Sequence, residues 1–184
     1  MTFNCMIAGV GGQGTVLASR LIAAAAMKKG FDVRTTETIG MAQRGGCVVS
    51  HVRVGENVFS PVIPLGKSDA LIAFEPAEAV RQLPYLKNDG TLIVCSSAIK
   101  PITGDYDVNA AIDFLKTKII KLVIIEGSSI LNAKTLNVVL LGAAAKTGIF
   151  PFDPETLKEV LQEIIPKRFL EMNQKSFELG RSLP

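Results

Sequence analysis

The sequence contains no tryptophan, and its other aromatic residues are few: nine phenylalanines and two tyrosines among 184 residues. Platforms that bind single-stranded nucleic acid stack the bases on aromatic side chains, so this scarcity argues against one. The formal net charge is only +3, spread along the chain without a basic block, whereas nucleic-acid binding leaves a basic patch. We therefore expect no nucleic-acid partner.

Residues that bind metals are also scarce. There is one histidine, and the three cysteines Cys5, Cys47 and Cys95 lie far apart with no Cys-x-x-Cys spacing. Iron–sulfur clusters and standard zinc sites need closely grouped ligands, so we expect the chain alone to hold neither. Each cysteine lies in a strand-like apolar run. This placement is typical of small core residues in a reducing compartment, which indicates a cytoplasmic protein.

The longest stretch without charge, Met1–Ser19, does not have the pattern of a membrane segment. It lacks the positive start of a signal peptide, and glycines interrupt it at positions 9, 11, 12 and 14. We interpret it as a buried strand that leads into a glycine turn, and we expect no association with a membrane.

Length and pattern together predict the fold class. At roughly 150 residues per domain, 184 residues amount to about one domain, so residues 1–184 are expected to form a single domain. Short apolar runs alternate with helical patterns, which predicts a three-layer, Rossmann-like α/β fold with a mostly parallel, mixed sheet. The expected strands are Phe3–Ala8, Asp32–Thr38, Cys47–Val54, Ala70–Phe74, Thr91–Ser96 and Lys121–Ile125. The expected helices include 14–29, a short one from Glu75-Pro76, 109–118, 131–147, one from Asp153-Pro154 and a last one ending near Gly180.

Two turns are predicted from local composition. Gly55-Glu56-Asn57 is expected to fold Cys47–Val54 back on Val58-Phe59 as an antiparallel hairpin. Asn88-Asp89-Gly90 is expected to turn the chain into the strand at Thr91.

The segment Gly9-Val10-Gly11-Gly12-Gln13-Gly14 matches Gly-x-Gly-x-x-Gly between a predicted strand and a predicted helix. Glycines permit a tight turn and a close approach of phosphates, and the helix N-terminus offers free N–H groups to an anion. Dinucleotide sites also place an acid about 20 residues later, and Glu37 lies near that position. The alternative is that these glycines only allow close packing of the helix or of another subunit.

A second glycine-bearing segment runs from Thr36 to Gly46 and reads Thr-Glu-Thr-Ile-Gly-Met-Ala-Gln-Arg-Gly-Gly. It precedes the predicted strand that contains Ser50-His51-Val52-Arg53. Together with the first turn it resembles the gamma-type subunit of 2-oxoacid:ferredoxin oxidoreductases, most closely the indolepyruvate branch. Further matches are Ile63-Pro64-Leu65-Gly66 with Ser68-Asp69, Phe74-Glu75-Pro76, and Asn137 with Leu141-Gly142. The resemblance covers nearly the whole chain. Ile39 and Cys47 depart from the pattern, where His and Ser are usual.

The resemblance implies a share in oxidative decarboxylation of a 2-oxoacid to an acyl-CoA, with two electrons passed to ferredoxin. It places thiamine diphosphate and [4Fe-4S] clusters on a large partner subunit, with CoA as co-substrate. The cofactor-binding residues expected here are Gly9, Gly11, Gly12, Gln13, Gly14, Gln43, Arg44, Gly45 and Gly46. No catalytic acid, base or nucleophile cluster is recognisable.

Arg44 lies in a glycine-flanked loop, where a guanidinium could grip phosphate or carboxylate oxygens. The alternative is a solvated surface arginine. Gln43 is either a ligand contact or an amide that stabilises the loop. The single histidine, His51, is expected to be structural, because no proton-transfer partner is evident. Glu37 is expected to anchor the loop that follows it, and Asn137 to satisfy a loop backbone group.

Three functions remain open from the sequence. The first is a non-cluster subunit of a multi-subunit oxidoreductase. The second is a stand-alone NAD(P)-dependent oxidoreductase, supported by the first glycine motif and Glu37. The third is a non-catalytic nucleotide-binding module.

Overall fold

A computed structural model describes residues 2–40, 46–99, 106–130 and 132–183. Six strands form one sheet in the order β2-β3-β1-β4-β5-β6. Their bounds are β1 Phe3–Val10, β2 Asp32–Ile39, β3 Cys47–Gly55, β4 Ser68–Ala73, β5 Leu86–Cys95 and β6 Lys121–Ile125. The pairs β1–β4, β4–β5 and β5–β6 are parallel, whereas β3 is antiparallel to both β1 and β2. The predicted mixed, mostly parallel sheet is therefore confirmed.

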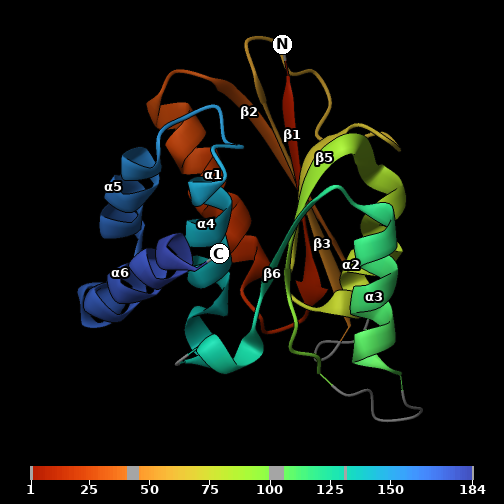
Figure 1. The fold of residues 1–184 in the computed structure, drawn as a ribbon. Helices are drawn as coiled ribbons and strands as arrows, with labels where there is room; N and C mark the ends of the chain where they lie inside the picture. The colour runs from red at the N-terminus through yellow and green to blue at the C-terminus, as the bar shows by residue number, and fades with distance from the viewer. Residues whose placement is uncertain (1, 41–45, 100–105, 131, 184) are drawn as a thin grey trace.

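Helices cover both faces of the sheet and give the predicted three layers (Figure 1). One face carries α1 Thr15–Lys28, α4 Leu136–Lys146, α5 Pro154–Ile164 and α6 Lys167–Ser182; the other carries α2 Pro76–Gln82 and α3 Val108–Lys118. Short 3-10 turns lie at Leu83–Tyr85, Gly127–Ser129 and Ala133–Thr135. No helix in the described part of the chain is long and apolar enough to cross a membrane.

Helix α4 is apolar on all sides because it lies between the sheet and α6. Every residue from Leu136 to Ala145 is buried. Glycines allow the close approach of the two helices: a Cβ on Gly142 would lie 2.2 Å from the Phe177 carbonyl oxygen, and one on Gly180 would lie 2.0 Å from the Val139 carbonyl oxygen. The two helices therefore pack backbone against backbone at these glycines.

The predicted hairpin after Gly55 is wrong. Both edges of β3 are already occupied, one by β1 and the other by β2, so Val58-Phe59 has no strand edge to pair with. The Val58 N–H donates instead to the Asp32 carboxylate at 3.2 Å. The antiparallel partner of β3 in the local sequence is β2, which precedes it.

The turn predicted at Asn88-Asp89-Gly90 is also wrong, because β5 runs from Leu86 through these residues. The pairing of β5 with β4 is irregular at this point: Ser68 pairs with Leu86, and Ala70 pairs with Thr91. The helix predicted from residue 131 starts at Leu136, after the 3-10 turn Ala133–Thr135.

Candidate functional site

The two central parallel strands, β1 and β4, send their following helices to opposite faces of the sheet. The chain leaves β1 for α1 on one face and leaves β4 for α2 on the other. In open α/β sheets, ligands bind outside the carboxyl ends of the strands at this kind of switch point. The glycine turn 9–14 follows β1 and Phe74-Glu75-Pro76 follows β4. This carboxyl end is therefore the candidate site.

The turn after β1 requires glycine at particular positions. Gly12 and Gly14 have φ of 98° and 86°, which only glycine adopts without strain. Gly9 lies close to the neighbouring strand, since a Cβ there would be 3.0 Å from Cβ of Phe74. The Gln13 side chain folds back so that its Oε1 accepts from the Val10 N–H at 2.8 Å. Gln13 therefore closes the turn.

Helix α1 begins at this turn without a side-chain cap and without an acid in its first turn. Such a helix start presents N–H groups and partial positive charge. Asn137 of α4 supports the turn from the side: it is 3% exposed, and its Nδ2 donates to the Gly14 carbonyl oxygen at 3.4 Å. The expected contact of Asn137 with a loop backbone group is thus present.

The two glycine motifs of the sequence meet in the structure. The Gly11 N–H donates to the Gly46 carbonyl oxygen at 2.9 Å, and Val10 pairs with Cys47 where β1 and β3 run side by side. The Gly40 N–H also donates to the Cys47 carbonyl oxygen at 3.0 Å. Both ends of the second glycine loop are therefore held beside the first turn. Gln43, Arg44 and Gly45 lie outside the described residues.

Two buried carboxylates in the same region have no assigned role in the sequence interpretation. Glu75 and Glu78 are 4% and 3% exposed. The Tyr106 hydroxyl donates to Glu75 Oε2 at 2.7 Å, and the Cys47 thiol donates to Glu78 Oε2 at 2.8 Å. Arg81 Nε lies 3.5 Å from Glu78 Oε1. An acid directly after a buried strand, with a second acid three residues later, is the sequence signal that would have indicated this pair.

The pKa values of Glu75, Cys47 and Tyr106 are all raised. Burial raises the pKa of the Glu75 carboxyl more than the hydrogen bond from Tyr106 lowers it. Burial, followed by the bond to Glu78, raises the pKa of the Cys47 thiol to about 11. Burial and the bond to Glu75 raise the pKa of Tyr106. Because a thiolate is the reactive form of cysteine, the raised pKa argues against Cys47 as an activated nucleophile.

His51 and Glu37 both have structural partners. The His51 Nδ1 accepts from the Ile63 N–H at 3.2 Å, and burial lowers the pKa of the ring. Glu37 Oε1 accepts from the Ser19 hydroxyl at 3.2 Å, which ties β2 to α1. The contact of His51 agrees with the structural role expected for it. The contact of Glu37 is with α1 rather than with the loop that follows β2.

No group of three or more His, Cys, Asp or Glu side chains within residues 2–40, 46–99, 106–130 and 132–183 could hold a metal ion. The three cysteines lie on three different strands, and Cys5 and Cys95 are fully buried. The residues present therefore do not fit an iron–sulfur cluster.

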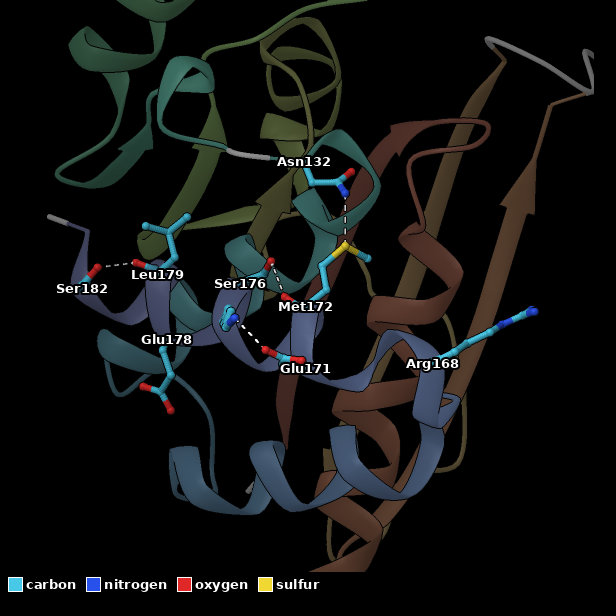
Figure 2. Close-up of a pocket in the computed structure, with 9 residues that line it drawn as sticks. Asn132, Arg168, Glu171, Met172, Ser176, Glu178, Leu179 and Ser182 are labelled. Carbon is cyan, nitrogen blue, oxygen red and sulfur yellow. Dashed lines mark hydrogen bonds and ion pairs between the residues drawn. The ribbon is translucent and has the colours of Figure 1, made fainter.

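A hollow of about 780 Å³ lies elsewhere, along α6 (Figure 2). It is lined by Asn132, Arg168, Glu171, Met172, Lys175, Ser176, Glu178, Leu179 and Ser182. Its charged groups do not converge: Lys175 pairs with Glu171 along the helix at 2.7 Å, and Arg168 points away from the other residues. The hollow contains none of the predicted site residues.

Comparison with known proteins identifies relatives over the whole length of the chain. Residues 4–183 match the model of the pyruvate ferredoxin/flavodoxin oxidoreductase family. The indolepyruvate oxidoreductase subunit IorB of Thermococcus kodakarensis is 36% identical over 97% of this chain and 94% of its own length. The pyruvate/ketoisovalerate oxidoreductases common subunit gamma of the same organism is 28% identical over 92% of this chain and 90% of its own.

Solved structures share the fold. The gamma subunit of a keto/oxoacid ferredoxin oxidoreductase from Geobacter sulfurreducens matches 100% of this chain and 96% of its own, with a TM-score of 0.72 and 23% identity. A 2-oxoglutarate:ferredoxin oxidoreductase from Magnetococcus marinus matches 98% of this chain but only 30% of its own, with a TM-score of 0.73 and 20% identity. The family model and the sequence relatives confirm the family resemblance that the sequence analysis stated. The chain belongs to the pyruvate ferredoxin/flavodoxin oxidoreductase family.

Proposed function

We propose that this chain is the small, non-cluster subunit of a 2-oxoacid:ferredoxin oxidoreductase that acts on indolepyruvate or a related arylpyruvate. The complex would convert the 2-oxoacid and CoA into the acyl-CoA and carbon dioxide, and pass two electrons to ferredoxin. Residues 1–184 act as one domain that shapes the site without performing the electron transfer. The isolated chain is inactive.

The hydrogen bond between Gly11 and Gly46 is the observation that carries this proposal. It joins the two glycine motifs at the switch point of the sheet, beside the uncapped start of α1. An edge of backbone N–H groups and glycines suits an anion that approaches closely, such as a phosphate of CoA. We propose that Gly9, Gly11, Gly12, Gln13 and Gly14, with Gln43, Arg44, Gly45 and Gly46, form this edge facing the partner's active site.

The remaining cofactors are assigned to the partner. The cysteines of this chain do not fit a cluster, so [4Fe-4S] clusters and thiamine diphosphate would reside on a large subunit. Ferredoxin would then interact with the complex. The relatives whose names include "subunit" support this division of labour.

A stand-alone dehydrogenase is the second candidate, and the position of Glu37 disfavours it. In dinucleotide-binding folds the acid lies at the end of the strand next to β1. Here β3 separates β2 from β1, and the Glu37 carboxylate already accepts from Ser19. We therefore expect no tight binding of NADH.

Reconstitution tests the proposal. Ferredoxin reduction by indolepyruvate and CoA should require both this chain and the large subunit, and either chain alone should be inactive. The purified chain should be colourless and free of iron and thiamine diphosphate. Activity of the isolated chain with NAD and a 2-hydroxy acid, together with a dissociation constant for NADH on the order of micromolar, about −8 kcal/mol, would contradict it.

A variant tests the proposed edge. Arg44→Ala should leave the melting temperature of the isolated chain unchanged, since exposed ion pairs contribute about 0–1 kcal/mol. In the complex it should raise the KM for CoA or weaken assembly. Unchanged kinetics and affinity would remove Arg44 from the site, and a large melting shift alone would make it structural.

A further inference from the structure

The loop that joins β3 to β4, residues 56–67, exposes apolar side chains at the opposite end of the sheet from the glycine turn. We name it the amino-end loop; it lies at the end of the sheet where the N-terminus lies (Figure 1). Phe59 is 92% exposed, Val62 53% and Leu65 64%. These three residues contribute little to the folding core, so their exposure needs another explanation.

The amino-end loop is anchored by its intervening residues. Val58 and Ile63 are 2% and 0% exposed. The Val58 N–H donates to the Asp32 carboxylate, and the Ile63 N–H donates to His51 Nδ1, each at 3.2 Å. Apolar anchors thus alternate with exposed apolar residues along the same loop.

Further contacts fix the backbone of the loop. The Arg53 guanidinium donates to the Ser60 carbonyl oxygen at 2.9 Å, and the Gly66 N–H donates to the Pro84 carbonyl oxygen at 2.9 Å. Pro61 and Pro64 restrict the backbone within it. A loop whose backbone is already ordered loses less entropy when it binds. Exposed aromatic residues on such a surface are typical binding hot spots.

The area and shape of the loop favour a large, concave partner. One aromatic side chain buries roughly 150–250 Å² on binding, so the three exposed residues amount to about 400 Å², the size of a functional patch. A stable interface buries about 800 Å² on each partner. Two copies that met loop to loop would bury only the patch itself, whereas a pocket that surrounds the loop would also cover its sides.

The charges beside the loop indicate which charge the rim of that pocket carries. Arg53 and Lys67 flank the loop, and neither forms an ion pair with a carboxylate in the described part of the chain. The nearby carboxylates of Asp32 and Asp69 already pair with Arg34 and Lys87. Glu56 then offsets only one of the two positive charges. Carboxylates around the partner's pocket would complement the excess.

We propose that the amino-end loop is a docking element that inserts Phe59, Val62 and Leu65 into a concave apolar pocket with an acidic rim on the larger subunit of the complex. This inference rests on the proposed function, which supplies the larger subunit. It adds a contact with the larger subunit at the amino end of the sheet, away from the glycine turn.

Binding of the purified large subunit to variants of this chain tests the proposal. Phe59→Ser/Leu65→Ser should raise the dissociation constant at least 30-fold and leave the melting temperature of the isolated chain unchanged. Met27→Ser, which removes an apolar residue of 64% exposure from the end of α1, should change affinity less than twofold. Lys67→Glu should weaken binding threefold or more at low salt and less at high salt. At saturating concentrations of the double variant, activity should return to that of the wild type.

The outcomes separate the docking proposal from the proposed function. If the wild-type chain neither binds nor activates the large subunit, the proposed function fails. If it does both and the double variant binds equally well, the docking proposal alone is overturned. It is also overturned if the wild-type chain is a dimer in sedimentation experiments and the double variant is a monomer, because a second copy then occupies the loop.

Discussion

At the carboxyl end of the sheet, a glycine turn and an uncapped helix start lie beside the buried carboxyls of Glu75 and Glu78. At the amino end, by contrast, a well-anchored loop exposes apolar side chains. Polar backbone at one end suits a small anionic ligand, and apolar surface at the other suits a protein. Under the two proposals above, the difference lets one sheet carry a ligand site at one end and a docking contact at the other. It follows from topology, because the switch point between β1 and β4 lies at the carboxyl end only.

The largest expected effect is a loss of folding stability when one glycine at each end of the sheet is replaced by alanine. Gly14 and Gly66 both have positive φ, 86° and 65°. A Cβ on Gly14 would lie 2.7 Å from Asn137 Nδ2, whereas one on Gly66 would have no atom within 4 Å. Gly66→Ala should therefore cost only the backbone strain, about 1–2 kcal/mol, and Gly14→Ala should cost about 1–3 kcal/mol more. Urea unfolding of both variants measures the difference, and equal losses would show that Asn137 moves away freely.

Asn137→Ala should have the next largest effect. It removes the bond to the Gly14 carbonyl oxygen and should cost about 1–3 kcal/mol, because the partner is partly buried. In the assembled complex it should also raise the KM for CoA, since the turn loses its lateral support. Asn132→Ala, a change at a cap in front of α4 that does not touch the turn, is the control. Equal effects of the two variants on the KM would contradict a specific role of Asn137.

The two ends should respond oppositely to pH. The Glu75 pKa is raised by burial, so its ionisation destabilises the folded state as pH rises above about 4.5. The His51 pKa is lowered by burial, so stability falls as pH drops below about 6.5. Glu75→Gln should become progressively more stable than the wild type as pH rises from 4 to 8. His51→Gln should become progressively more stable relative to the wild type as pH drops from 7 to 5.

Denaturant unfolding at several pH values measures both responses. Each variant is compared with the wild type at the same pH, so that other titrating groups cancel. If the difference in unfolding free energy between Glu75→Gln and the wild type does not depend on pH, the Glu75 carboxyl is well solvated. If the difference in unfolding free energy between His51→Gln and the wild type does not change with pH, the His51 ring ionises freely in the folded chain.

The smallest expected effect concerns Cys47. The pKa of its thiol is about 11, so little thiolate is present at pH 8. Glu78→Gln should lower this pKa and speed alkylation by iodoacetamide several-fold, because the rate follows the thiolate fraction. Mass spectrometry locates the label, and the buried Cys5 and Cys95 serve as internal controls. An unchanged rate would show that burial alone protects the thiol.

Local patterns predicted most elements of the fold, and the errors came from pairing at a distance. Strands such as Lys121–Ile125 and the start of α5 at Asp153-Pro154 were predictable from apolar runs and capping residues. The wrong hairpin after Gly55 arose because local sequence does not indicate that β1 and β2 already flank β3. Turn residues at 88–90 were misleading because β5 accommodates them in a register shift.

The candidate site was predictable only in part, for the same reason. The glycine turn is visible as a motif, but its contact with Gly46 depends on the pairing of β1 with β3. The carboxyl cluster of Glu75 and Glu78 with Tyr106 and Cys47 joins three separate segments. The exposed loop residues could not be recognised, because Phe59 and the buried Val58 are adjacent in sequence and equally apolar.

One titration tests the separation of the two ends most directly. The chain is titrated into the large subunit at several CoA concentrations, and ferredoxin reduction gives both the subunit affinity and the KM for CoA. Gly12→Ala strains an exposed turn residue with φ of 98° that has no neighbour within 4 Å of a Cβ; it should raise the KM severalfold and leave affinity unchanged. Phe59→Ser should lower affinity and leave the KM unchanged. If both variants alter the same parameter, the two ends do not have separate roles.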